Sequence, residues 1–142
     1  MMLRAILAGC ILALPLPARG QTAHGGSLPT TRAGVYTATQ ADKGAEIYAL
    51  SCASCHPAVT HSGPAFAAKW QGQPLGELFR FMSEEMPKQD PGILSPQEYT
   101  LVLAYMLRIN GMPAGSRELS SDPVQLAGIR IDFKPPRDTS PR

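Results

Sequence analysis

Apolar residues recur every three to four positions in three stretches of the chain, which is the period of a helix with one buried face. These positions are Ala41, Ala45, Tyr48 and Ala49 in the first stretch, Leu75, Leu78, Phe79 and Met82 in the second, and Leu101, Val102, Tyr105, Met106 and Ile109 in the third. The pattern predicts an all-α fold of three to four helices. A chain of 142 residues is long enough for one such domain with tails.

Capping residues indicate where the second and third helices begin and end. The second helix is expected over residues 75–84. Ser95 is expected to cap the third helix, with Pro96 as its first residue and Glu98 completing a capping box. Asn110-Gly111 then supplies a left-handed stop.

The first helix is expected to begin at Thr39, because Asp42 follows three residues later. Gly44 lies in its middle, where glycine costs about 1 kcal/mol relative to alanine. Either another helix passes close to Gly44, or the glycine is merely tolerated. Residues 57–72 are expected to form a loop.

The N-terminus has the pattern of a secretory signal over residues 1–20. Arg4 precedes an apolar run from residue 5 to residue 16, and the small-residue site Ala18-Arg19-Gly20 follows. Cys10 lies within the apolar run and is taken as part of the signal. The run is too short for a stable membrane span, so a membrane association is expected only if the signal is retained as an anchor.

The rest of the chain divides into three segments by composition. Residues 21–37 are rich in Gly, Thr and Ala and are interpreted as a flexible linker. Residues 38–120 hold the predicted helices and form the domain. Residues 121–142 are a proline-rich extension, expected to be partly disordered, whose apolar residues could dock on the domain. These apolar residues are Leu126, Ile129 and Ile131.

The first predicted helix runs into Cys52-Ala53-Ser54-Cys55-His56. This is C-x-x-C-H, the attachment signal of a c-type haem. Two thiols at this spacing can each bond a vinyl carbon at one edge of a porphyrin, and the histidine that follows can ligate the iron. Without the signal, Cys52 and Cys55 are the remaining cysteines, so no disulfide framework is left to explain.

Three other interpretations of the two cysteines are weaker. A redox dithiol is expected after a strand, and no strand pattern precedes Cys52. A structural zinc site needs a second pair of ligands, and no further cysteine follows Cys55. A disulfide between the two would close a very small loop and stabilise little.

A methionine is the candidate for the second iron ligand. The chain offers Met82 on an apolar helix face, Met106 within the last helix and Met112 after it. In Met86-Pro87, the proline forces the methionine into an extended conformation just past the second helix. Such a methionine can point its thioether at the haem face opposite His56, so Met86 is the preferred ligand and Met82 the alternative.

Four further residues in the expected loop bear on the haem site. The carbonyl of Pro64 could accept the second N–H of His56, although an ordinary Gly-Pro turn has the same spacing. Trp70 and Phe66 are expected to form walls of the pocket, and the indole N–H of Trp70 could reach a haem propionate. His61 is expected to be exposed.

These motifs occur in the order found in class I cytochromes c, and the chain resembles that family over roughly residues 34–120. The resemblance is greatest to the bacterial branch that serves quinoprotein (PQQ-dependent) dehydrogenases. It is carried by Gly34-Val35-Tyr36-Thr37, Gln40-Ala41-Asp42-Lys43-Gly44, Gly63-Pro64-Ala65-Phe66, Trp70, Met86-Pro87, Pro91-Gly92-Ile93-Leu94-Ser95, Ala104-Tyr105-Met106 and Asn110-Gly111-Met112-Pro113-Ala114-Gly115. Pro57 departs from the family, which usually has glycine after the histidine.

The resemblance implies helices around one covalently bound haem c, with His56 and Met86 as axial ligands. It also implies that Gly44 and Tyr105 mark the crossing of the first and last helices. The implied function is electron transfer without substrate catalysis, in the periplasm. Electrons would pass from a quinoprotein dehydrogenase towards a terminal oxidase or another cytochrome. The alternatives are a five-coordinate haem enzyme or gas sensor, and a fixed subunit of a dehydrogenase complex.

Charge limits the partners further. Of the 13 Lys and Arg residues, loss of Arg4 and Arg19 with the signal leaves 11 against 11 Asp and Glu. The mature polypeptide is formally neutral and has no basic patch with interleaved aromatic residues, so nucleic acid is not expected as a partner. Electrostatic steering towards a protein partner is expected to be weak.

Overall fold

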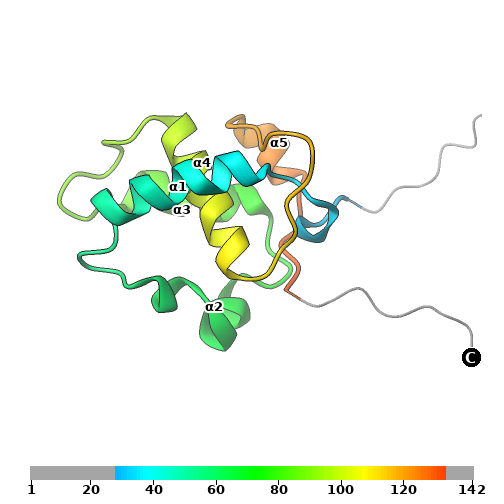
Figure 1. Cartoon of the computed structure of the whole chain (residues 1–142), viewed down its shortest axis with the longest axis horizontal. Coiled ribbons are helices and arrows are strands. Elements are labelled where there is room, and N and C mark those ends of the chain that lie inside the picture. Colours follow the sequence, from blue (N-terminus) through cyan, green and yellow to red (C-terminus); the bar gives the residue numbers. More distant parts are fainter. Residues whose placement is uncertain (1–27, 134–142) are drawn as a thin grey trace, which may run out of the picture.

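Helices form almost all the regular structure of residues 28–133, the part of the chain that the computed structural model describes (Figure 1). The expectation of an all-α fold is confirmed for these residues. In chain order the helices of this part are η1 (Thr31–Ala33), α1 (Ala38–Ser51), η2 (Ala58–His61), α2 (Gly63–Trp70), α3 (Leu75–Glu85), α4 (Pro96–Ile109) and α5 (Pro123–Ala127). The predicted signal and the chain end from residue 134 lie outside the described residues.

Helices α1 and α4 cross in close contact, and Gly44 lies at the crossing. A Cβ atom on Gly44 would lie 1.9 Å from the carbonyl oxygen of Leu101 and 3.1 Å from Cβ of Tyr105. Arg108 near the end of α4 forms an ion pair with Asp42 of α1. The close approach of a second helix therefore explains the glycine, as the resemblance implied.

The ends of α3 and α4 agree closely with the sequence analysis. Ser95 caps α4 in a capping box with Glu98, and Gly111 follows the helix with a φ of 74°. Helix α3 ends one residue later than expected. Met86 then adopts the expected extended conformation, with φ −135° and ψ 147°, and its peptide bond to Pro87 is cis.

The start of α1 and the segment after the C-x-x-C-H motif differ from expectation. The cap of α1 is Thr37, not Thr39, because the Thr37 side chain accepts from the backbone N–H of Gln40 and the Gln40 side chain accepts from Thr37. Gln40 also bonds both backbone groups of Leu119, which is distant in sequence. The expected loop 57–72 contains η2 and α2, since Phe66 and Trp70 bury one face of a short helix.

Residues before α1 and after α4 pack on the helices. Tyr36 is buried, and its hydroxyl donates to the carbonyl of Met112 at 2.7 Å. After α5, which packs against α3, the backbone of Arg130 bonds to Pro29 and Thr31. Leu126 and Ile131 are fully buried. Within residues 28–133, parts of the expected linker and extension thus lie against the domain.

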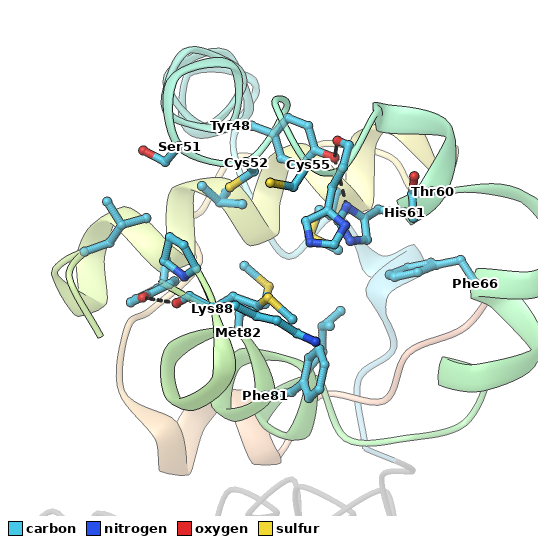
Figure 2. A pocket seen from close by; sticks show the side chains of 18 of the residues that line it. Tyr48, Ser51, Cys52, Cys55, Thr60, His61, Phe66, Phe81, Met82 and Lys88 are labelled. Atoms are coloured by element: carbon cyan, nitrogen blue, oxygen red, sulfur yellow. Dashed lines mark hydrogen bonds between the residues drawn. The ribbon is translucent and has the colours of Figure 1, made fainter. Parts of the chain in front are cut away.

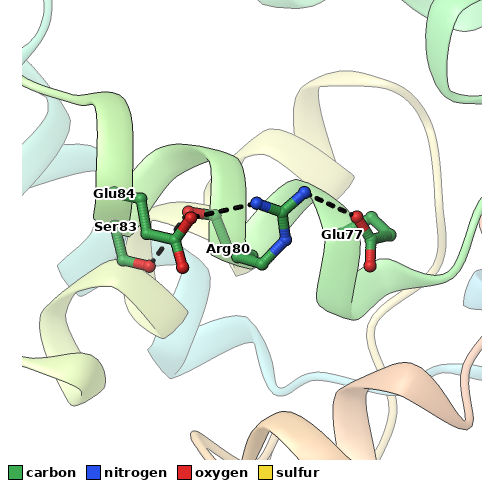
Figure 3. Close-up of polar contacts among 4 residues, drawn as sticks. All are labelled: Glu77, Arg80, Ser83 and Glu84. Carbon is green, nitrogen blue, oxygen red and sulfur yellow. Dashed lines mark hydrogen bonds and ion pairs between the residues drawn. The ribbon is translucent and has the colours of Figure 1, made fainter.

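Helix α3 has one face towards the interior and one towards solvent. On the outer face, Arg80 forms ion pairs of 2.9 Å with Glu77 and with Glu84 (Figure 3). All three side chains are exposed, so the pairs contribute little to stability. Within residues 28–133, no helix is both long and apolar enough to cross a membrane.

We predict that Gly44→Ala lowers the unfolding free energy of the haem-loaded protein by at least about 3 kcal/mol, the upper end of the usual cost of overpacking. The added methyl group would overlap the backbone of Leu101, which cannot turn aside as a side chain can. Denaturant titration followed by circular dichroism measures the loss. Glu46→Ala, at an exposed position of the same helix, is the control and should change stability by less than about 0.5 kcal/mol. Equal midpoints for the two variants would refute the close crossing.

Candidate functional site

A cavity of about 540 Å³ lies between the C-terminal end of α1, helices α2 and α3, and one face of α4. Figure 2 shows Cys52, Cys55 and His61 above it, and Phe81 and Met82 of α3 below it. Most of its lining is apolar, and the lining includes both cysteines and the histidine of the C-x-x-C-H motif. The volume is within the range of about 300–1,000 Å³ that is usual for small-molecule and cofactor sites.

A tight turn after α1 positions the motif at the cavity. Backbone N–H groups of Cys52 and Ala53 both donate to the carbonyl of Tyr48 at 2.9 Å. The N–H groups of Cys55 and His56 then donate to the carbonyl of Cys52, at 3.2 and 2.9 Å. The last turn of α1 therefore continues into the motif and brings both thiols and the imidazole to one cavity.

The two thiols are free and differ in environment. Cys52 is half-buried, and burial raises the pKa of its thiol. Cys55 is exposed. Both line the cavity at its solvent-accessible side, so a porphyrin edge bonded to them would lie near the molecular surface.

Tyr48 and His61 both contact the candidate iron ligand His56. The Tyr48 hydroxyl donates to the carbonyl of His56 at 2.5 Å and lies 2.9 Å from Nδ1 of His61. Burial, with smaller effects of Cys52 and Tyr105, raises the Tyr48 pKa to about 12. The hydroxyl therefore keeps its proton at neutral pH.

His61 is not exposed, contrary to the sequence expectation. It is half-buried, lines the cavity, and has its ring centroid 5.0 Å from that of His56. Burial lowers its pKa most, followed by the charges of His56 and Lys69. The sequence did not reveal the burial of His61, because its position depends on η2, which was expected to be loop.

The structure does not bring Pro64 to His56. Pro64 is exposed in the first turn of α2 and is not among the residues that line the cavity. Within residues 28–133, no hydrogen bond joins its carbonyl to His56. The reason is that residues 63–70 form a helix, whose backbone carbonyls point along its own axis.

Three methionines line the cavity, namely Met82, Met86 and Met106. Met82 and Met106 are buried within helices, whereas Met86 is half-buried at the end of α3. The Tyr99 hydroxyl donates to the carbonyl of Met86 at 2.6 Å and accepts the N–H of Gly92 at 3.1 Å. Tyr99 thus ties the segment after α3 to helix α4 at two points, Met86 and Gly92.

Trp70 and Phe66 are buried and line the cavity, as the sequence analysis expected of its walls. Lys69 also lines it, and its ammonium nitrogen lies 5.0 Å from the ring centroid of Trp70 and 4.5 Å from that of Phe81. Sequence analysis did not single out this lysine. Its cation is held over two aromatic rings at the cavity edge, where it would attract an anionic group.

The donor set of this cavity suits a covalently attached haem. Two thiols, an imidazole and thioether groups surround an apolar space. Histidine and methionine are the axial ligands of cytochromes c, and C-x-x-C-H is their attachment signal. A space lined mainly by apolar side chains also accommodates a flat, mostly apolar macrocycle.

A comparison with protein families agrees with this geometry. Residues 39–106 match the family model described as cytochrome c oxidase, cbb3-type, subunit III. Residues 39–106 are a cytochrome c domain. The match runs from α1 to within α4 and includes the C-x-x-C-H motif and Met86. Neither a curated protein nor a solved structure matches the chain significantly.

The cofactor of the cytochrome c domain is therefore covalently bound haem c, as the sequence predicted. When bound, the haem supplies a one-electron couple between Fe(II) and Fe(III). The chain supplies the enclosure, with α1 and α4 packed on each other behind the attachment turn. Met86 is close to the attachment motif in the same cavity.

We predict that Tyr99→Phe loosens the segment that carries Met86. The variant loses the hydrogen bonds to Met86 and Gly92, and one such bond contributes about 1 kcal/mol, or about fivefold in an opening equilibrium. Amide hydrogen exchange at Gly92 should accelerate by about this factor or more while exchange in α1 stays unchanged. Tyr105→Phe is the control, because the Tyr105 hydroxyl forms no hydrogen bond within residues 28–133. Unchanged exchange at Gly92 in Tyr99→Phe would contradict the prediction.

Proposed function

We propose that the chain is a mono-haem electron carrier of the periplasm. Cys52 and Cys55 bind the haem covalently, and His56 and Met86 ligate its iron from opposite sides. Single electrons pass from a quinoprotein dehydrogenase to a terminal oxidase or another cytochrome. The observation that carries the proposal is one apolar cavity lined by both cysteines and the histidine of the C-x-x-C-H motif and by a methionine just past a helix end.

The backbone around Met86 favours it as the second ligand. Its extended conformation frees its side chain from the helical direction that Met82 keeps. Tyr99 bonds the Met86 carbonyl and so restrains the backbone from which the thioether extends. Met82 and Met106 are buried in helices α3 and α4 and have the environment of core methionines.

With both axial positions taken by the chain, no position on the iron remains for a substrate. A thioether ligand and an apolar enclosure favour the reduced state, so the potential is high for a haem. The attachment edge is near solvent, because Cys55 is exposed. An electron can thus leave without any opening of the fold.

The resemblance to quinoprotein-associated cytochromes supports a dehydrogenase as donor. It rests on motifs outside the haem signal, such as Gly34-Val35-Tyr36-Thr37, and Tyr36 has a structural role in binding the Met112 carbonyl. The export signal proposed for residues 1–20 supports the periplasm. Covalent attachment suits that compartment, since a haem held by thioethers cannot dissociate.

A second candidate is a fixed subunit of a respiratory complex. The family model that matches residues 39–106 is described as an oxidase subunit, which favours this alternative. A fixed subunit would remain bound to a larger protein, whereas a carrier would exchange between donor and acceptor. The haem chemistry is the same in both.

We predict that Met86→Ala abolishes the weak red absorption band that arises from sulfur bonded to ferric iron. The haem stays attached, because Cys52 and Cys55 are untouched. Optical spectra of the ferric protein at neutral pH measure the band, and carbon monoxide binding to the ferrous form reports an open site. Met82→Leu and Met106→Leu are the matched controls and should keep the band and resist carbon monoxide. Loss of the band in Met82→Leu alone would assign the ligand to Met82.

We also predict that the protein isolated from its native host at low salt is a free carrier of its own size. A quinoprotein dehydrogenase of that host, given its substrate, should reduce it rapidly. Because the mature polypeptide is formally neutral, the second-order rate should change by less than about threefold between low and high ionic strength. Stopped-flow absorbance measures the rate. Co-purification with a larger oxidase or dehydrogenase subunit would instead support the fixed-subunit alternative.

A further inference from the structure

His61 is held beside His56 by contacts from three separate elements. Its backbone carbonyl accepts the Asn110 side-chain N–H at 2.7 Å, at the C-terminal end of α4. Its Nδ1 lies 2.9 Å from the Tyr48 hydroxyl of α1. Its ring packs edge-on against Phe66 of α2, with centroids 6.0 Å apart. One of these contacts holds the backbone of His61, and the other two hold its ring.

The hydrogen bonds around Tyr48 determine which nitrogen of His61 carries the proton. The Tyr48 hydroxyl has one proton and donates it to the carbonyl of His56 at 2.5 Å. It can therefore only accept from Nδ1 of His61, which must be the protonated nitrogen. Nε2 is left with a free lone pair, and within residues 28–133 it forms no hydrogen bond.

An iron-bound His56 needs an acceptor for its other ring nitrogen. Iron binds Nε2 of a C-x-x-C-H histidine when its Nδ1 carries the proton, and metal-bound histidines almost always donate that N–H to a nearby acceptor. Within residues 28–133, the carbonyl of Pro64 forms no hydrogen bond with His56, and Pro64 does not line the cavity. The ring of His61 has its centroid 5.0 Å from that of His56, a separation that one hydrogen bond of about 3 Å between ring nitrogens can span.

We propose that Nε2 of His61 accepts the Nδ1–H of His56 and positions the iron-binding imidazole, in the place that a backbone carbonyl would otherwise take. Tyr48 orients His61 by accepting its Nδ1–H, and so the chain Tyr48–His61–His56 extends from helix α1 to the haem iron. This inference rests on the proposed ligation of iron by His56. An imidazole acceptor makes His56 a stronger electron donor and stabilises Fe(III) relative to Fe(II).

The direct test is nuclear magnetic resonance of the ferrous full-length holoprotein labelled with ¹⁵N in its histidines. Two nitrogens joined by an N–H···N hydrogen bond show a scalar coupling through the bond. We expect a slowly exchanging Nδ1–H of His56 coupled to Nε2 of His61. A His56 Nδ1–H without this coupling, or one lost by rapid exchange, would overturn the proposal.

Variants at residue 61 separate a hydrogen-bonding role from packing. His61→Leu fills similar space without an acceptor and should raise the midpoint potential, because His56 becomes a weaker donor. His61→Gln offers a side-chain oxygen and should return the potential most of the way to that of the wild type. Val59→Ala, at an exposed position of η2 outside the cavity lining, is the control and should leave both the ¹⁵N coupling and the potential unchanged. Equal potentials in His61→Leu and His61→Gln would contradict the positioning role.

The absorption spectrum and the ¹⁵N coupling together distinguish failure of the His61 hydrogen bond from failure of the proposed iron ligation. If the wild type has the absorption spectrum of a His/Met haem c but no coupling to His61, His56 ligates iron with another acceptor. If that spectrum is missing, the ligation by His56 and Met86 fails first. Both spectra come from one preparation, with the absorption spectrum taken in the ferric state and the magnetic resonance spectrum in the ferrous state.

Discussion

The backbone contact between α1 and α4 at Gly44 is the constraint on which the rest of the structure depends. Without a side chain at Gly44, the carbonyl of Leu101 can approach the axis of α1. This approach fixes the end of α1, and the C-x-x-C-H motif follows directly from that end. It also places Asn110, at the end of α4, close enough to bond the carbonyl of His61. One helix crossing thereby orients residues on both sides of the attachment turn.

Tyrosine side chains of α1 and α4 form hydrogen bonds near the haem cavity, whereas Met86 follows helix α3. Tyr48 of α1 bonds His56 and lies beside His61, while Tyr99 of α4 bonds the segment of Met86. Two tyrosines on the crossing helices thus support the two proposed axial ligands from opposite sides. Helix α3 supplies an apolar wall, with its charged residues turned to solvent. The arrangement explains how a small domain can hold a large apolar cofactor with few charged groups nearby.

The parts of the chain beyond the family match strengthen the same core. Gln40 bonds both backbone groups of Leu119, and Tyr36 bonds the carbonyl of Met112. The backbone around Ile131 pairs with Gly72 and Gln73, just ahead of α3. These segments cover the side of the domain away from the attachment turn. They leave the edge at Cys55 uncovered, where electron exchange is proposed.

The sequence by itself determined the elements whose causes are local. The attachment motif needs five consecutive residues, the caps of α4 lie within a few residues of its ends, and the extended Met86 follows from Pro87. Long-range contacts decided the rest. Thr37 caps α1 in place of Thr39 because Gln40 is held by Leu119, and residues 63–70 form a helix because Phe66 and Trp70 are buried. The position of His61 beside His56 depends on α1, α2 and α4 together, and no spacing along the chain encodes such a meeting.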